Sequence, residues 1–364
     1  MENTINTSEI SRPRISPEKV LRRKIHNRYE WAGIALLIQN IIGTCINILF
    51  MGLVVFIQAQ RSGDLIAGLK QAVQGSSSGP DYTIPIAGVA FIIANIIAAV
   101  ISLKVSKAGK IRDNLVKPVN IGVIGIIMAC FAILGISNLD EIIMSKLTSL
   151  FGSSNAMLNN SFNAIFEYDN KLLTVFSLFY VCIAGPILEE VLCRGALLKL
   201  SSHIDIKFGI VFSSLLFGIM HGNLSQLFNA TLLGLLLAYV TVKTRSLIPA
   251  MFMHIVNNSY SMILYGITRN MTEEQGTSFA KVNNLVFMII GLVCFVIIIL
   301  RLRKVDSGKN PLMINEVAPE SDISNIKASK AGLTVKEVLT SWAFWFNIGI
   351  FALNMMTVSM MAGR

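Results

Sequence analysis

Apolar segments alternate with polar connections along most of the chain. A helix that crosses the hydrocarbon core of a bilayer, about 30 Å thick, needs roughly 20 mostly apolar residues. We therefore predict an all-α polytopic membrane protein whose core has eight transmembrane helices. The predicted spans are residues 31–58, 84–105, 119–136, 172–200, 208–221, 224–242, 247–267 and 284–300.

The same pattern divides the chain into four parts. We expect a basic cytoplasmic arm at residues 1–30, the eight-span core at 31–304 and a polar linker at 305–341. Residues 342–361 form another apolar run, which as a helix rising about 1.5 Å per residue would just cross a bilayer. We predict a ninth span there, with an interfacial helix as the alternative. The long connection 138–170 has apolar residues at helical spacing and predicts a helix at the membrane surface.

Composition supports the membrane assignment. Hydrophobic residues make up 53% of the 364 residues and charged residues only 14%, against roughly 25% charged residues in soluble domains. The formal net charge of +10 does not indicate nucleic-acid binding, because Lys and Arg cluster beside the apolar segments, as orientation signals do. The five cysteines form no CxxC pair, so we expect neither a disulfide framework nor a thiolate zinc site.

The distribution of basic residues predicts the orientation in the membrane. With the N-terminus in the cytoplasm, the basic connections 104–117, 243–245 and 301–304 all face the cytoplasm. The opposite connection 138–170 contains a single basic residue, Lys146. Because cytoplasmic connections carry an excess of Lys and Arg, we predict a multi-pass protein of the cell membrane, in contact with the lipid bilayer and with a cytoplasmic N-terminus.

Ionisable residues are rare in the predicted spans. Glu189 and Glu190 are adjacent in the fourth span, and His221 and His254 lie in the fifth and seventh. A charge at the bilayer centre costs at least ~2.5–3.5 kcal/mol on insertion scales, so such residues mostly face an interior cavity and have a function. Each also has a structural interpretation: a Glu190–Arg194 salt bridge, a histidine at a helix end, or polar contacts between helices. Their joint occurrence favours a functional site.

Three short motifs combine these residues. They are Glu189-Glu190-x-x-x-Arg194, Phe217-x-x-x-His221 and His254-x-x-x-Asn258. In their order and approximate spacing they resemble the motifs of the CPBP family, which comprises the CAAX proteases and the bacteriocin-processing or bacteriocin-immunity (Abi) membrane proteins. The resemblance covers about Leu172–Ile267 and departs at Cys193, where family members often have phenylalanine.

The resemblance implies an intramembrane endopeptidase of either the glutamic or the metallo type, acting on a peptide or membrane-protein substrate. Glu189 would be the general base that activates a water, and His221 would hold and polarise that water. His254 and Asn258 would donate hydrogen bonds to the oxyanion. No cofactor is required in this mechanism. The other motif residues would support the site or bind a substrate carboxylate: Glu190, Arg194 and Phe217.

Several alternatives stay open. Glu189, His221 and His254 provide the three ligands that a catalytic zinc ion requires, although no HExxH spacing is present. A non-catalytic immunity or scaffold protein of the same fold is a second function, and a proton-coupled transporter is a third. In straight antiparallel spans Glu189 and His221 would lie near opposite membrane surfaces, so we expect a break in the fourth span at Gly185-Pro186.

Overall fold

The described part of the chain is helical and contains no strand, which confirms the all-α prediction. The computed structural model describes residues 17–64, 66, 83–105, 115–118, 121–151, 165–166, 171–202, 205–304 and 330–362. Its longer helices are α1 (Pro17–Ser62), α3 (Thr83–Val105), α4 (Gly122–Phe151), α9 (Ile206–Met220), α10 (Leu224–Thr244), α11 (Ile248–Thr268), α12 (Glu273–Arg303), α14 (Lys330–Leu339) and α15 (Trp342–Ala362).

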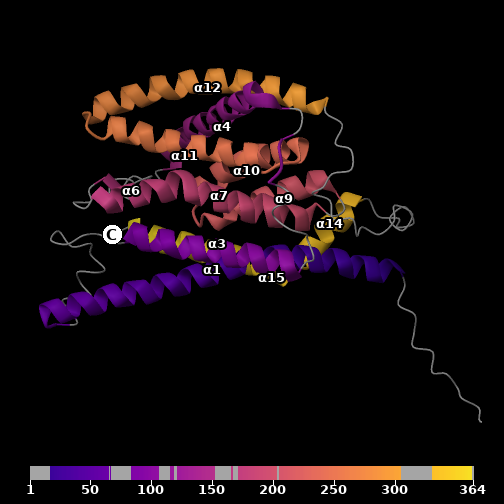
Figure 1. Ribbon diagram of the computed structural model, residues 1–364, viewed down its shortest axis with the longest axis horizontal. Helices are drawn as coiled ribbons and strands as arrows, with labels where there is room; N and C mark the ends of the chain where they lie inside the picture. Colours follow the sequence, from indigo (N-terminus) through magenta and orange to yellow (C-terminus); the bar gives the residue numbers. More distant parts are fainter. Residues whose placement is uncertain are drawn as a thin grey trace, which may run out of the picture.

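The fourth predicted span is one continuous helical segment, residues 171–201, built from α-helical and wider π-helical turns. Its parts are α6 (Lys171–Phe179), η2 (Tyr180–Ala184), α7 (Gly185–Glu190), η3 (Val191–Leu197) and α8 (Leu198–Ser201). This segment lies with α9 and α10 in the middle of the molecule (Figure 1). On one side are α4, α11 and α12, and on the other are α1, α3 and α15.

Two apolar cores hold these layers together. The first joins α1 to α9 through buried residues that include Leu36 and Phe212. The second joins α4, α10 and α12 through residues that include Ile133, Leu237 and Ile298. The middle layer therefore packs on both of its faces, which fixes the helices that carry the three motifs.

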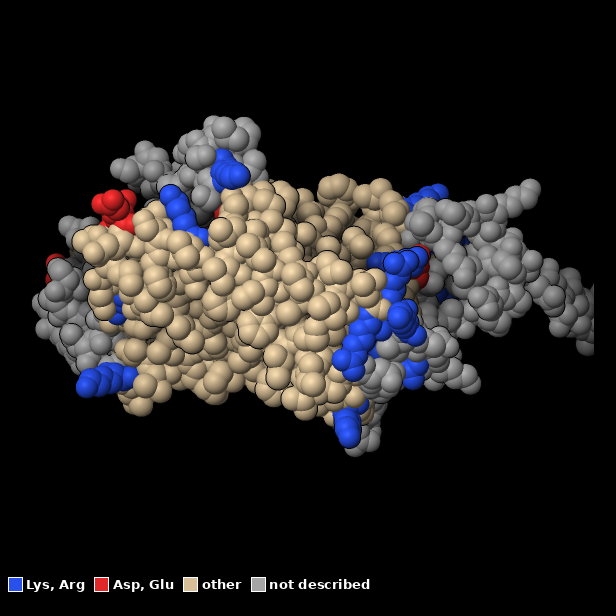
Figure 2. Space-filling view, turned by 90° about the horizontal axis from the view of Figure 1, so that it is seen from above, with Lys and Arg blue, Asp and Glu red and all other residues tan. Residues whose placement is uncertain are grey.

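The helices have the length and composition expected for a membrane protein. Six of those described are long and apolar enough to cross a bilayer, while α9 and α15 are shorter apolar helices. Figure 2 shows a broad face without charged side chains, with Lys, Arg, Asp and Glu lying toward its two ends. Such a band matches a hydrocarbon core bounded by two polar surfaces. The polytopic membrane class is confirmed.

Helices extend past two predicted boundaries at the ends of the core. Helix α1 begins at Pro17, so the described part of the predicted N-terminal arm is helix, and Ile25 and Tyr29 are buried with 1% exposure each. The many charged residues of this segment obscured the apolar residues, which recur at helical spacing and form one face of the helix. Likewise, the end of the predicted linker forms α14, whose Val338 packs into the first core.

A third boundary also differs. Helix α4 continues without a break to Phe151, whereas we expected a separate surface helix in the connection 138–170. The sequence from Ser137 to Phe151 has no glycine or proline that would end the helix. Residues 152–164 of that connection and 305–329 of the linker lie outside the described residues.

Candidate active site

The adjacent glutamates lie on α7, between two π-helical stretches. π-Helical turns are rare and occur frequently at functional sites. In η2 the N–H of Gly185 donates to the carbonyl of Tyr180, five residues earlier. The next bond of this pattern would run from residue 186 to Val181, but Pro186 has no N–H to donate. The expected break at Gly185-Pro186 is therefore a change of helical pitch rather than an end of the helix.

Asn258 supplies the missing hydrogen bond. Its side-chain Nδ2 donates to the carbonyl oxygen of Val181 at 3.1 Å. A backbone carbonyl without a partner is costly in an apolar interior, so this bond stabilises the π-helical turn just before the glutamates. Asn258 thus ties α11 to the segment that carries Glu189 and Glu190.

Glu190 is the centre of a buried ionic cluster. Its Oε1 accepts hydrogen bonds from Nη1 of Arg194 at 2.7 Å and from Nδ1 of His254 at 3.0 Å. Glu190 is 0% exposed, Arg194 1% and His254 4%. The predicted Glu190–Arg194 pair is present, but it lies deep in the interior. Removing one partner of such a pair leaves an uncompensated buried charge.

Arg194 contacts several partners among the described residues. Besides Glu190, its Nη2 donates to the carbonyl oxygen of Gly234 at 3.2 Å. Its guanidinium carbon lies 4.5 Å from the centre of the Phe217 ring. A Cβ at residue 234 would lie 3.2 Å from Arg194 Nη2. This geometry favours the supporting role of Arg194 over contact with a substrate carboxylate.

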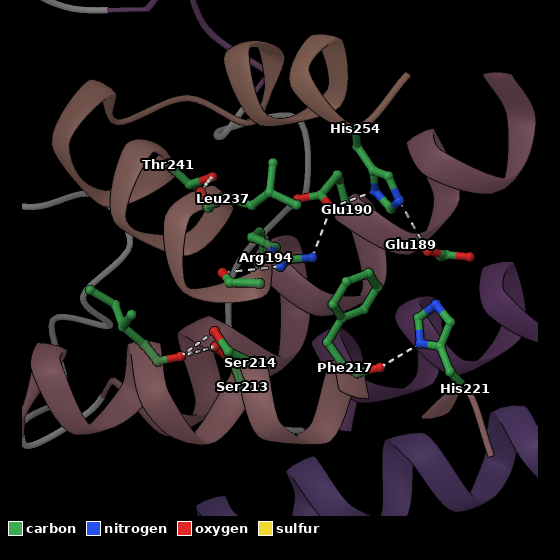
Figure 3. Close-up of polar contacts among 12 residues, drawn as sticks. Glu189, Glu190, Arg194, Ser213, Ser214, Phe217, His221, Leu237, Thr241 and His254 are labelled. Carbon is green, nitrogen blue, oxygen red and sulfur yellow. Dashed lines mark hydrogen bonds and ion pairs between the residues drawn. The ribbon is translucent and has the colours of Figure 1, made fainter. Parts of the chain in front are cut away.

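Glu189 has a different environment from its neighbour. Its side chain is 13% exposed, and its Oε2 lies 3.6 Å from Nε2 of His254. His254 therefore stands between the two carboxylates, with one ring nitrogen toward each (Figure 3). Glu189 is the acidic group of the motif that a substrate or a water can reach.

Phe217 and His221 complete the cluster from α9. The Phe217 ring packs edge to face against both imidazoles, with centroids 4.9 Å from His221 and 5.7 Å from His254. Nδ1 of His221 lies 2.8 Å from the carbonyl oxygen of Phe217. A carbonyl only accepts, so Nδ1 carries the hydrogen, and Nε2 of a neutral ring is left as an acceptor. Figure 3 shows His221 and Glu189 on the same side of this group.

The length of α9 explains how Glu189 and His221 come to similar depths. Helix α9 has 15 residues, which at about 1.5 Å per residue is roughly 22 Å and too short to cross a bilayer. Its end at His221 therefore falls short of the far membrane surface. Glu189 precedes Ser201, at the other side of the connecting turn, by 12 residues (201 − 189), or roughly 18 Å of helix. The separation that straight antiparallel spans would give is therefore absent, because α9 is short.

The segment that carries this site matches a known family. Residues 171–260 match the family model described as "Type II CAAX prenyl endopeptidase Rce1-like", and all three motifs lie inside that range. This segment is thus similar to the CAAX-protease family. The resemblance predicted from the motifs is thereby confirmed.

A curated relative points to the same family. A Bacillus subtilis (strain 168) protein described as "Putative membrane peptidase YdiL" is 32% identical over 97 residues. The match covers 26% of this chain and 40% of the relative, so the chain spans about two fifths of the length of that protein. No solved structure matches the chain.

Within the matched segment, the structure brings every predicted site residue into one neighbourhood. Residues absent from the motifs also take part, namely the Gly234 and Val181 carbonyls. Gly234 interrupts a run of leucines in α10, a sequence signal for close helix contact, whereas the Val181 carbonyl has no such signal.

The donor atoms do not fit the zinc alternative well. Among the described residues no group of three His, Cys, Asp or Glu side chains is arranged to hold a metal ion. The ring nitrogens of His254 face the two carboxylates, and Nδ1 of His221 is bound to a backbone carbonyl. We therefore derive no step that uses a metal.

Proposed function

We propose that the protein is an intramembrane endopeptidase that hydrolyses a peptide bond of a membrane-associated substrate with a water activated by Glu189. The observation that carries the proposal is the pairing of a partly exposed Glu189 carboxylate with His254, next to a fully buried Glu190–Arg194 pair. The Glu189 carboxylate is accessible to a water or a substrate, and the neighbouring Glu190 carboxylate fixes the imidazole of His254. The family match of residues 171–260 supports the same function.

The reaction follows from the positions of these groups. Glu189 takes a proton from a water whose second hydrogen is directed to Nε2 of His221. The water oxygen bonds to the carbonyl carbon of the substrate and gives a tetrahedral oxyanion. When the C–N bond breaks, Glu189 returns the proton to the leaving nitrogen, and the products are a carboxylic acid and an amine.

His254 and Asn258 are the proposed donors to the oxyanion. Nδ1–H of His254 is fixed by Glu190, which orients Nε2 toward the reacting carboxylate. Donation from Nε2 as well requires the doubly protonated ring, because Nδ1 already carries the hydrogen bound to Glu190. Once Glu189 is protonated, its attraction for the Nε2 hydrogen weakens, and that hydrogen becomes available to the oxyanion. One hydrogen of the Asn258 amide binds the Val181 carbonyl. The amide has a second hydrogen, which can bind the oxyanion. Losing one such donor typically reduces the rate by ~10²–10³-fold.

We also propose that the N-terminus is cytoplasmic. The first turns of α1 and the end of α12 lie at the same end of the molecule (Figure 1). The basic residues of these two segments include Arg22, Lys24, Arg301 and Arg303. The positive-inside rule assigns such an end to the cytoplasm.

The test compares purified wild type with Glu189→Gln in proteoliposomes that contain a fluorogenic membrane-anchored peptide. The substitution keeps the size of the side chain and removes the base, so we expect cleavage to fall by ~10²–10⁴-fold while the protein stays folded. Both proteins are also assayed after treatment with a zinc chelator, where we expect no change.

Each alternative has its own outcome in this experiment. Cleavage by Glu189→Gln at the wild-type rate contradicts the assigned base. Loss of wild-type activity with chelator, restored by zinc, supports the metallo type. A wild type that cleaves nothing but shows proton-coupled flux supports a transporter, and one that shows neither supports a scaffold.

A further inference from the structure

The turn that carries His221 interrupts the helical backbone at membrane depth. Helix α9 has 15 residues and falls short of the far membrane surface, and residues 221–223 then connect it to α10 without helical structure. In the hydrocarbon region, non-helical backbone is tolerated only where protein or water supplies its hydrogen-bond partners. This turn therefore needs polar groups around it.

Part of this need is met by the turn itself. The N–H groups of His221 and Gly222 donate to the carbonyl oxygens of Gly218 and Ile219 at 3.2 and 3.1 Å. Nδ2 of Asn223 donates to the carbonyl oxygen of His221 at 3.2 Å. The last four carbonyls of a helix have no donors within that helix, so the end of α9 can accept further hydrogen bonds.

A polar side chain from a distant part of the chain meets this turn. A Cβ at Gly222 would lie 3.0 Å from Nδ2 of Asn354, a residue of α15. Gly222 has no side chain to keep the amide away, and its φ of +71° is a conformation that glycine adopts without strain. Asn354 has an interaction partner, while Leu353 and Met356 beside it are exposed apolar residues. An amide among such residues requires a hydrogen bond inside the membrane.

Helix α15 is held firmly enough to place this amide. A Cβ at Gly33 of α1 would lie only 2.8 Å from the Cβ of Ala343 of α15. Nδ2 of Asn347 donates to the carbonyl oxygen of Gly33 at 3.0 Å. The ring of Phe344 lies 5.9 Å from that of Phe212 in the middle of α9. Small residues and interhelical hydrogen bonds of this kind fix membrane helices against each other.

We propose that Asn354 is a positioning residue of the active site. Its amide binds the backbone of the turn 221–223 and thereby holds Nε2 of His221 at the attacking water. This inference rests on the proposed endopeptidase function. It gives α15, which lies outside residues 171–260, a role in the reaction that involves no contact with the substrate.

The first test measures KM and kcat for cleavage of a membrane-anchored peptide by Asn354→Leu. Leucine has nearly the same size without the amide, so we expect kcat to fall about tenfold, the effect of one hydrogen bond. KM stays within about twofold, because His221 acts on the water and not on the bound peptide. Leu353→Ala, at an exposed neighbouring position on the same helix, is the matched control and leaves both constants unchanged.

The second test repeats the Asn354→Leu change in two backgrounds. If Asn354 acts through His221, the change lowers kcat no further once His221→Ala has removed the imidazole. In the Asn258→Ala background His221 is still present, so the tenfold fall in kcat persists. A general loss of structure would instead lower kcat in both backgrounds.

Three results overturn the inference while wild type and Glu189→Gln behave as proposed. They are an unchanged kcat in Asn354→Leu, a rise in KM alone, and equal falls in kcat in the two backgrounds. If Asn354→Leu does not fold, Asn354→Ala is judged by the same criteria. A wild type without cleavage instead removes the proposed function, and the inference falls with it.

Discussion

Two clusters of polar side chains among the apolar helices, one around Glu189 and one around Asp140, differ in the partners of their buried carboxylate. The second group, here the amide cluster, consists of Asn138, Asp140, Asn229, Tyr260 and Asn283. Asn229 donates to Asp140 at 3.0 Å, and Tyr260 donates to Asn138 at 3.1 Å. Asn283 in turn donates to the Tyr260 hydroxyl. An amide thus satisfies the carboxylate on α4, and the hydroxyl and the other two amides form a neighbouring hydrogen-bond chain.

The active-site cluster also contains a buried carboxylate, but the partners of that carboxylate are of another kind. Its buried carboxylate, Glu190, is paired with a guanidinium and an imidazole, and the preceding residue, Glu189, presents a second carboxylate that stays partly exposed. Asp140 is only 5% exposed. The difference teaches that a polar group in a membrane helix is a weak sign of catalysis. An accessible acid next to an imidazole is a stronger one.

The largest expected effect is on the cleavage rate, and it differs between the two clusters. His221→Ala removes the group that orients the water, so we expect cleavage to fall by ~10²–10³-fold with little change in thermal stability. Tyr260→Phe removes a hydroxyl from the amide cluster and leaves the rate within about twofold, because a membrane hydrogen bond contributes only ~0.6 kcal/mol on average. Equal losses of activity in both variants would show that the two clusters do not differ in their role in cleavage.

The second expected effect is on stability. Arg194→Met leaves Glu190 buried without its cation, and we expect the free energy of unfolding to fall by about 3–5 kcal/mol, measured by denaturant titration in detergent micelles. Adding Glu190→Gln removes the uncompensated charge and recovers part of this loss. An Arg194→Met protein as stable as wild type would show that the pair is not the rigid support of His254.

A smaller effect is expected at the π-helical turn. Asn258→Ala leaves the Val181 carbonyl without a donor and costs about 1–2 kcal/mol of stability. In a Pro186→Ala background the backbone regains an N–H at residue 186, so the same Asn258→Ala change costs less. The measurement is a double-mutant cycle of unfolding free energies, and a cycle with no coupling would contradict this role of Asn258.

Sequence alone predicts the local pairs of the site. Glu190 and Arg194 are four residues apart on one helix, as are His254 and Asn258, and this spacing places each pair on one face. The hydrophobic pattern likewise predicts the helices, because apolar runs of this length have few other structures in a bilayer. The family motifs then identify the side chains that come together in the site.

The rest depends on contacts that no local pattern encodes. The bond from Asn258 to Val181 joins residues 77 positions apart and exists only because the helix widens before Pro186. The burial of Glu190 and Arg194 depends on Phe217 and Gly234 from two other helices. The charged residues at the beginning of α1 masked the buried face that contains Ile25 and Tyr29.

The most direct test of the central claim compares two isosteric neutralisations, Glu189→Gln and Asp140→Asn, by the rate of peptide cleavage in proteoliposomes. We predict that Glu189→Gln lowers the rate by at least about 10²-fold, while Asp140→Asn stays within about threefold of wild type. Both proteins must be folded and inserted to the same extent. Cleavage by Glu189→Gln at the wild-type rate would show that the accessible carboxylate is not the base and would contradict the account.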